Sequence, residues 1–151
     1  MGYQKFLRMG GIVLLSLLGL ESTTTAKNGR DFAGFYNLVN VTDKGAEVEG
    51  TLILRLFNYS GSDLKQVAAT VRETPPGAGT LASFPRIALW QDGTDVVIQQ
   101  HIAIPRQEFQ QWSGHGEPNV FLIYKDDNGR EFQKTAQVSP HPITVPEGAA
   151  Q

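Results

Sequence analysis

The chain has 151 residues, of which 40% are hydrophobic and 19% are charged, and it contains no cysteine. This length matches one domain and suffices for a hydrophobic core without metal or disulfide cross-links. The absence of cysteine excludes a disulfide framework, a cysteine-ligated zinc site, an iron–sulfur cluster and a thiol nucleophile. A formal net charge of −2 argues against a nucleic-acid partner, because no basic excess is available to displace counterions from phosphate.

Residues 1–26 have the three-part pattern of a secretory signal peptide. Lys5 and Arg8 are basic, residues 9–20 form an apolar run of twelve, and residues 21–26 are small and polar. Twelve helical residues rise only about 18 Å, well short of the roughly 30 Å hydrocarbon core of a bilayer. We therefore expect cleavage after Ala26, an extracytoplasmic location and no stable membrane span in the mature chain, rather than an uncleaved anchor or a buried helix.

Cysteine usage also bears on the compartment and on the organisation of the mature chain. Small extracellular domains of animals are often dense in disulfides, so an exported domain without any favours a bacterial envelope or periplasm. Residues 27–31 are predicted to be a flexible lead-in and residues 32–138 the folded body. Residues 139–151 contain three prolines and little apolar mass, which predicts a disordered Pro-rich tail.

Period-2 alternation of apolar side chains dominates the body and predicts antiparallel β-strands. In one run, Val48, Leu52, Leu54 and Leu56 share a face, opposite acidic, threonine and arginine side chains. The strong strand candidates are residues 47–57, 95–104, 119–125 and 130–138, and the weaker ones are 33–41 and 86–90. Turns rich in Asp, Asn and Gly separate several of them, notably at 91–94 and 126–129.

In two further segments the spacing of the apolar residues fits a helix. In residues 63–73, Leu64, Val67, Ala68 and Val71 have the spacing of a helical face, but Val67, Ala69 and Val71 also alternate as in a strand. A strand is favoured there, because a helix would interrupt a series of antiparallel strands. Residues 105–112 are predicted to form a helical turn, since Pro105 suits a first helical position and the aromatic residues of the segment fall on one face.

Seven strands with frequent turns and no βαβ spacing predict an all-β fold of two packed antiparallel sheets. Over residues 46–138 the chain resembles the immunoglobulin-like and fibronectin-type-III-like modules of bacterial exported proteins. The resemblance rests on a strand ending in Asn58-Tyr59-Ser60-Gly61, the alternating segment after Asp63, a Pro-Arg-Gln-Glu crossover reaching Trp112, and Pro118 before a 124–129 hairpin. It implies a seven-stranded antiparallel immunoglobulin-like β-sandwich with an adhesive, spacing or docking role. Antigen-type recognition is not implied, because the cysteine pair and tryptophan spacing of antibody domains are absent.

Residue patterns typical of catalysis or metal binding do not occur in the sequence. His101, His115 and His141 lie 14 and 26 residues apart, which matches no zinc signature. The acidic pair at 126–127 lacks the alternation of a calcium loop. Ser113 shares a loop with His115 but not the strand–turn–helix context of a nucleophile elbow. We therefore expect no catalytic residue, no metal and no cofactor.

Aromatic residues near strand ends are the remaining candidates for a binding surface. We predict Tyr36, Tyr59 and Trp90 as ligand contacts, because exposed rings supply large, rigid contact area; the alternative is that they close the core, as we expect of Trp112. Two functions stay open, a protein-interaction or structural module of the bacterial envelope and a carbohydrate-binding module, with an unrecognised enzyme as a third. Coplanar exposed rings would favour a glycan partner, whereas an exposed apolar strand edge, at 33–41 or 86–90, would favour an envelope protein.

Overall fold

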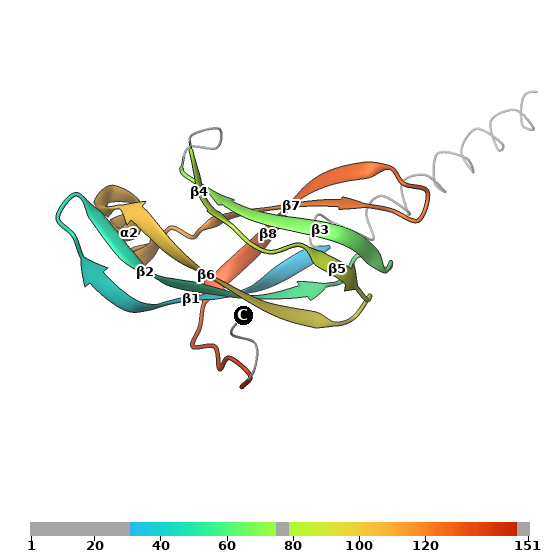
Figure 1. Cartoon of the computed structure of the whole chain (residues 1–151), viewed down its shortest axis with the longest axis horizontal. Coiled ribbons are helices and arrows are strands. Elements are labelled where there is room, and N and C mark those ends of the chain that lie inside the picture. Colours follow the sequence, from blue (N-terminus) through green and yellow to red (C-terminus); the bar gives the residue numbers. More distant parts are fainter. Residues whose placement is uncertain (1–30, 75–78, 148–151) are drawn as a thin grey trace, which may run out of the picture.

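Alternating apolar residues form strands along most of the body. The computed structural model describes residues 31–74 and 79–147, and this part contains eight strands and one short helix (Figure 1). The elements are β1 (Phe32–Asp43), β2 (Glu47–Asn58), β3 (Leu64–Arg72), β4 (Thr80–Ser83), β5 (Ile87–Trp90), β6 (Asp95–Pro105), α2 (Arg106–Ser113), β7 (Asn119–Lys125) and β8 (Glu131–Pro140). The prediction of an all-β fold is confirmed. The predicted signal peptide, most of the lead-in and residues 148–151 lie outside the described residues.

The eight strands differ from the seven that were predicted. The additional strand, β4, directly follows a stretch of sequence rich in Pro and Gly and has only four residues, so it is too short to display alternation. Residues 63–73 contain β3, so the choice of a strand there is confirmed. The predicted helical turn is α2, displaced by one residue. Within the described part of the chain, no helix is long and apolar enough to cross a membrane.

One pair of neighbouring strands is parallel, so the prediction of a purely antiparallel fold is wrong at this point. The hydrogen-bonded order is β4-β3-β7-β8-β1-β2-β6, and β5 also pairs with β3. β1 and β8 run parallel where Ala33–Tyr36 faces Gln137–Pro140. Side-chain alternation reports which face a residue occupies and not the direction of the neighbouring strand, so the sequence pattern could not reveal this pairing.

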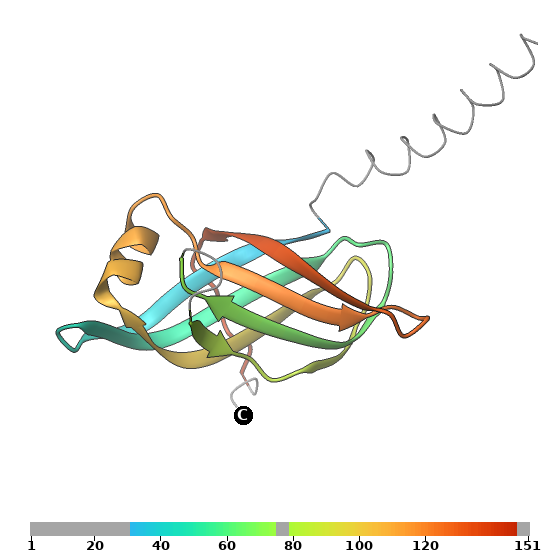
Figure 2. The same cartoon turned by 90° about the horizontal axis from the view of Figure 1, so that it is seen from above.

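The sheet folds over on itself into two layers (Figures 1 and 2). We call the layer of β1, β2 and β6 sheet A and the layer of β3, β4, β5 and β7 sheet B. β8 joins the layers, because Ala136 and the residues before it pair with β7 whereas Gln137–Pro140 pairs with β1. β4 also approaches β6, so the folded sheet is nearly closed.

The hydrophobic core fills the space between the two layers. Leu52, Leu54 and Leu56 of β2 are fully buried, and so are Leu122 of β7 and Val138 of β8. Burial of each large apolar side chain stabilises the fold by about 1.5–3 kcal/mol, which accounts for folding without disulfides. The prediction that alternate residues of residues 47–57 face the core is therefore confirmed.

Helix α2 is held in place by a buried carboxylate. Glu108 is 5% exposed and accepts hydrogen bonds from the indole N–H of Trp112 at 3.1 Å and from the hydroxyl and backbone N–H of Thr74 at 3.2 and 3.3 Å. Asn119 donates to the Thr74 hydroxyl at 2.9 Å. A buried carboxylate is costly unless donors surround it, and here they tie α2 to the end of β3 and the start of β7.

The C-terminal segment departs from the predicted disordered tail. β8 continues through Pro140, two residues into that tail, and the backbone N–H of His141 then donates to the Tyr36 carbonyl at 3.0 Å. Farther along, Ile143 and Val145 are half-buried while the residues around them are exposed. Both views place residues 141–147 on the outer side of sheet A (Figures 1 and 2).

Candidate binding site

Trp90 closes the core, so its prediction as a ligand contact is wrong. Its side chain is 1% exposed, its ring lies 5.6 Å from the Phe32 ring, and its indole N–H donates to the Thr94 carbonyl at 3.2 Å. Trp90 also pairs across the strands with Leu64, which faces the core. The position of a tryptophan near a strand end therefore did not determine the face that it occupies; the strand register did.

Tyr36 is also a core residue rather than a ligand contact. It is 6% exposed, and its hydroxyl donates to the backbone carbonyl of Trp112 at 3.2 Å. Burial raises the pKa of the Tyr36 phenol, and the nearby Glu117 carboxylate raises it further. Trp112 is likewise 6% exposed, so its prediction as a residue that closes the core is confirmed.

Tyr59 is exposed, as the prediction required of a ligand contact. Its side chain is 56% exposed, and it extends from a turn whose backbone is tightly held. The preceding Asn58 is fully buried and donates to the carbonyls of Ser62 and Trp90 at 2.9 and 3.1 Å. The Asn58 side-chain oxygen accepts from the backbone N–H and hydroxyl of Ser60 at 3.0 and 2.7 Å. Tyr59 therefore projects from a fixed position at the end of β2.

Tyr59 belongs to a group of stacked side chains that we call the aromatic face, formed by Phe35, Arg55, Phe57 and Tyr59. The Phe57 and Tyr59 rings are 5.8 Å apart with 5° between their planes, and Phe35 meets Phe57 edge-on at 6.1 Å. The Arg55 guanidinium lies 5.3 Å from the centre of the Phe57 ring, and Asp95 fixes it by an ion pair of 2.7 Å. Arg55 and Phe57 alternate with core leucines of β2, and Phe35 of β1 pairs with Arg55, so these side chains lie on the outside of sheet A.

A hollow of about 370 Å³ adjoins the aromatic face. Its lining residues come from β1, β2, the turn after β2 and the last part of β8 and are Ala33, Gly34, Phe35, Phe57, Tyr59, Gln137 and Ser139. The rings provide apolar surface, while the Gln137 amide and the Ser139 hydroxyl are neutral hydrogen-bonding groups. Apolar walls with a few polar groups are typical of binding sites for neutral ligands and peptides.

Apolar side chains extend beyond the aromatic face along the outside of sheet A. Ile53 is only 4% exposed, yet it alternates with Leu52 and Leu54 and does not belong to the core cluster. Its partners on the flanking strands are Asn37 and Gln99, which are polar. Sequence reasoning missed Ile53 because it treated that face of the strand as polar. The available signal was the unbroken apolar run Leu52-Ile53-Leu54, which implies cover on both faces.

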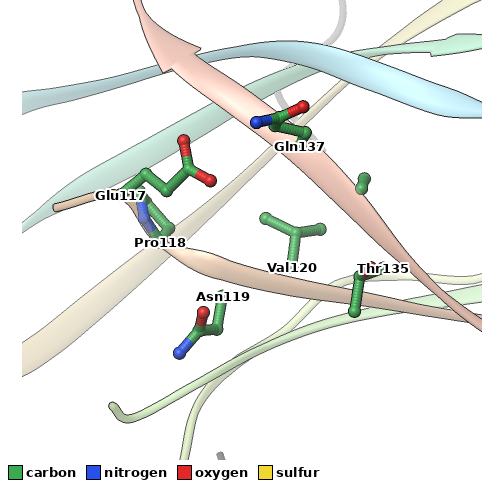
Figure 3. Close-up of a pocket in the computed structure, with 7 residues that line it drawn as sticks. Glu117, Pro118, Asn119, Val120, Thr135 and Gln137 are labelled. Carbon is green, nitrogen blue, oxygen red and sulfur yellow. The ribbon is translucent and has the colours of Figure 1, made fainter. Parts of the chain in front are cut away.

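A second depression is polar and lies between the start of β7 and the middle of β8. Figure 3 shows Glu117, Asn119, Thr135 and Gln137 around Val120, in a hollow of about 310 Å³. A neighbouring hollow of about 480 Å³ shares Glu117 and Asn119 with it. Of the described residues that line the two hollows, none is Phe, Tyr or Trp, Glu117 is the single carboxylate, and His115 lines the larger hollow together with it. A pair of carboxylates for acid–base catalysis is therefore not assembled by these lining residues.

The remaining ionisable candidates are spread over the described part of the chain. His101, His115 and His141 are all exposed, and the His141 ring lies 5.0 Å from that of Phe35. The backbone N–H of Arg130 donates to Asp126 and holds the pKa of that carboxyl below its usual value. Residues 126–129 thus form the predicted hairpin turn. Among residues 31–74 and 79–147, no three His, Asp or Glu side chains gather as metal ligands.

Comparison with known proteins does not define a family. No family model matches the chain, and no curated protein matches it. Two structures of a GH20 exo β-N-acetylglucosaminidase from Vibrio harveyi, an inactive mutant and a complex with N-acetylglucosamine, have TM-scores of 0.48 and 0.47 at 14% and 13% identity. They cover 78% of this chain, which spans only 19% of theirs. A β-glucosidase from intestinal bacteria has a TM-score of 0.32 at 11% identity, over 70% of this chain and 16% of that protein.

Proposed function

We propose that this protein is an exported, non-catalytic binding module of the bacterial cell envelope that acts through protein–protein interaction. The aromatic face carries this proposal. Tyr59 is 56% exposed on a turn fixed by buried hydrogen bonds, so its ring adds little to the core and is presented to solvent in a defined position. Tyrosine and arginine are enriched among residues that dominate binding energy at protein interfaces, and Arg55 and Tyr59 lie together on this face.

The finer fold assignment belongs to the same proposal. An immunoglobulin-like β-sandwich is supported by two face-to-face layers with one core between them and by mostly antiparallel pairing. Such modules present their outer sheet faces and edges to partners. The aromatic face lies on one outer face, while Leu89, 52% exposed, lies on β5 at the edge of sheet B. These two surfaces are competing candidates for the partner site.

Tyr59→Ala is expected to reduce capture of envelope proteins by the full chain at least tenfold, because truncation of a central aromatic contact at an interface costs about 2 kcal/mol or more. The melting temperature should stay within about 2 °C of the parent, because Tyr59 lies outside the core cluster. Quantitative mass spectrometry of the captured proteins measures the effect. Leu89→Ala tests the exposed edge of sheet B as the competing site and should leave capture within about twofold. A larger loss from Leu89→Ala than from Tyr59→Ala would place the partner at that edge. Equal capture by both variants and the parent would refute the aromatic face as the site.

A carbohydrate-binding module is the second candidate, because the Phe57 and Tyr59 rings are nearly parallel and flank a hollow with amide and hydroxyl groups. Sugar rings pack their apolar faces on aromatic side chains and hydrogen-bond to such groups. A glycan panel run with the same variants separates the two candidates. If Tyr59→Ala reduces glycan binding but not protein capture, the ligand of the aromatic face is a sugar and not a protein.

Export is tested by the mature N-terminus. Mass spectrometry of the protein isolated from the envelope of the native organism should show a chain that begins near Lys27, because signal peptidase cleaves after small residues such as Ala26. The same measurement on the cytoplasmic fraction serves as the control. Recovery of an intact chain beginning at Met1 from the envelope would contradict the proposed cleavage.

A further inference from the structure

The outside of sheet A contains more apolar surface than a solvent-facing layer requires. Phe35 and Val39 of β1, Ile53 and Phe57 of β2, and Val97 of β6 are all buried or half-buried there. None of them belongs to the core cluster or to the partly buried residues packed against it. A surface of this kind normally marks a contact with another segment or another molecule.

Ile53 is the residue at the centre of this apolar patch that needs a cover. At 4% exposure it is as buried as a core residue, although its cross-strand partners are polar and lie in the same layer. Residues 141–147 pass along this side of sheet A in both views (Figures 1 and 2). Ile143 and Val145 are half-buried while Pro142 and Thr144 are exposed, so the apolar side chains of this segment alternate as in an extended chain lying on a surface.

The segment begins beside the aromatic face. The His141 ring lies 5.0 Å from the Phe35 ring, and its backbone N–H donates to the Tyr36 carbonyl at 3.0 Å. Residues 140–146 read PHPITVP and contain no Asp, Glu, Lys or Arg. Proline fixes its own backbone angle and biases the preceding residue toward extended conformations, so this sequence loses little entropy when it lies flat on a sheet.

We infer that residues 141–147 form a strap over Ile53, and that the outer face of sheet A binds an extended, proline-containing apolar peptide of a partner protein in place of this strap. This inference rests on the proposed function, since it names the partner chemistry for the same face. The strap is the internal example of the ligand, with β-branched residues two apart between prolines. Aromatic-lined surfaces are known to accept such preorganised proline-containing segments.

An attached strap competes with any external peptide. Short tethers hold an intramolecular ligand at an effective concentration in the millimolar range, so the external peptide binds only in proportion to the fraction of chains whose strap is released. Weakening the strap without changing the sheet should therefore raise the affinity for the external peptide. If residues 141–147 did not cover this face, weakening them would give no such gain.

The experiment uses the full chain with Ile143→Ser and Val145→Ser combined, and Thr144→Ser with Glu147→Ser as the control at exposed positions. The probe is a labelled synthetic peptide of residues 139–147, and fluorescence anisotropy measures its dissociation constant. The strap variant should bind the peptide at least tenfold more tightly than the parent chain, and the control should match the parent. Adding Ile53→Ser to the strap variant should remove the gain. A folded strap variant that binds the peptide no better than the parent overturns the inference.

Hydrogen exchange on the parent chain decides the question if the strap variant does not fold. Saturating peptide should displace the strap and raise the exchange rate of the His141 amide, which donates to the Tyr36 carbonyl at 3.0 Å, and an unchanged rate overturns the inference. Failure of the proposed function and failure of the strap inference give different results. Tyr59-dependent capture with no peptide binding refutes only the strap and its peptide, whereas peptide binding without Tyr59-dependent capture refutes the aromatic face as the site for envelope proteins.

Discussion

Leu54→Asp is expected to abolish cooperative folding. Leu54 is fully buried in the middle of β2, which lies between its two partner strands β1 and β6. The substitution removes apolar contacts and places a carboxylate where no cation faces it, at a cost of several kcal/mol. Domains of this size are stable by only about 5–15 kcal/mol, so the substitution consumes most of the available stability. Circular dichroism should show no sharp thermal transition.

The control for this prediction is Gln133→Asp, which introduces the same carboxylate at an exposed position of β8. Gln133→Asp should lower the free energy of unfolding by no more than roughly 1 kcal/mol, which is the range over which residues differ in strand propensity. A cooperative transition of Leu54→Asp within a few degrees of the parent would mean that β2 does not turn this face to the core.

The sequence predicted which side of each strand faces the core, but it did not predict which strands lie next to one another. Alternation placed Leu52, Leu54 and Leu56 on one side because the core selects apolar residues at every second position. The parallel pairing of β1 with β8 leaves no such trace in the sequence. β8 changes layers within a continuous strand, so a purely local pattern could not show that this strand connects the two layers.

The candidate site was predictable only in part for a related reason. Tyr36, Tyr59 and Trp90 all lie near strand ends in the sequence, but register turns Tyr36 and Trp90 inward and leaves Tyr59 outside. The edge proposed at residues 33–41 is paired on both sides over Ala33–Tyr36, whereas β5, within residues 86–90, does pair with β3 alone. Which aromatic residues are exposed and which strand edges stay unpaired depends on how the strands pair in the folded protein, and residue type alone does not determine it.

Gly34→Ala is expected to destabilise the protein by about 3 kcal/mol, because it introduces a methyl group where two strands are already in contact. A Cβ at Gly34 would lie 2.1 Å from the Arg55 carbonyl oxygen and 3.1 Å from the Leu56 Cα, and both are backbone atoms that cannot rotate away. β1 would have to separate from β2. Gly34 also pairs with Val138 of β8, so the shift would disturb the strand that joins the two layers. The melting temperature should fall by roughly 10 °C.

The matched control is Gly79→Ala, where the nearest atom to an added Cβ is a Glu73 carboxylate oxygen at an ordinary 3.6 Å. That change should be neutral or slightly stabilising, since alanine reduces the entropy of the unfolded chain. Equal melting temperatures for the two variants would show that β1 can move away from β2 at little cost. Because Gly34 also lines the hollow beside Phe57 and Tyr59, such freedom would mean that the aromatic face is not held in one geometry before its partner binds. Preorganisation of the site and stability of the fold thus depend on the same close approach of two strands.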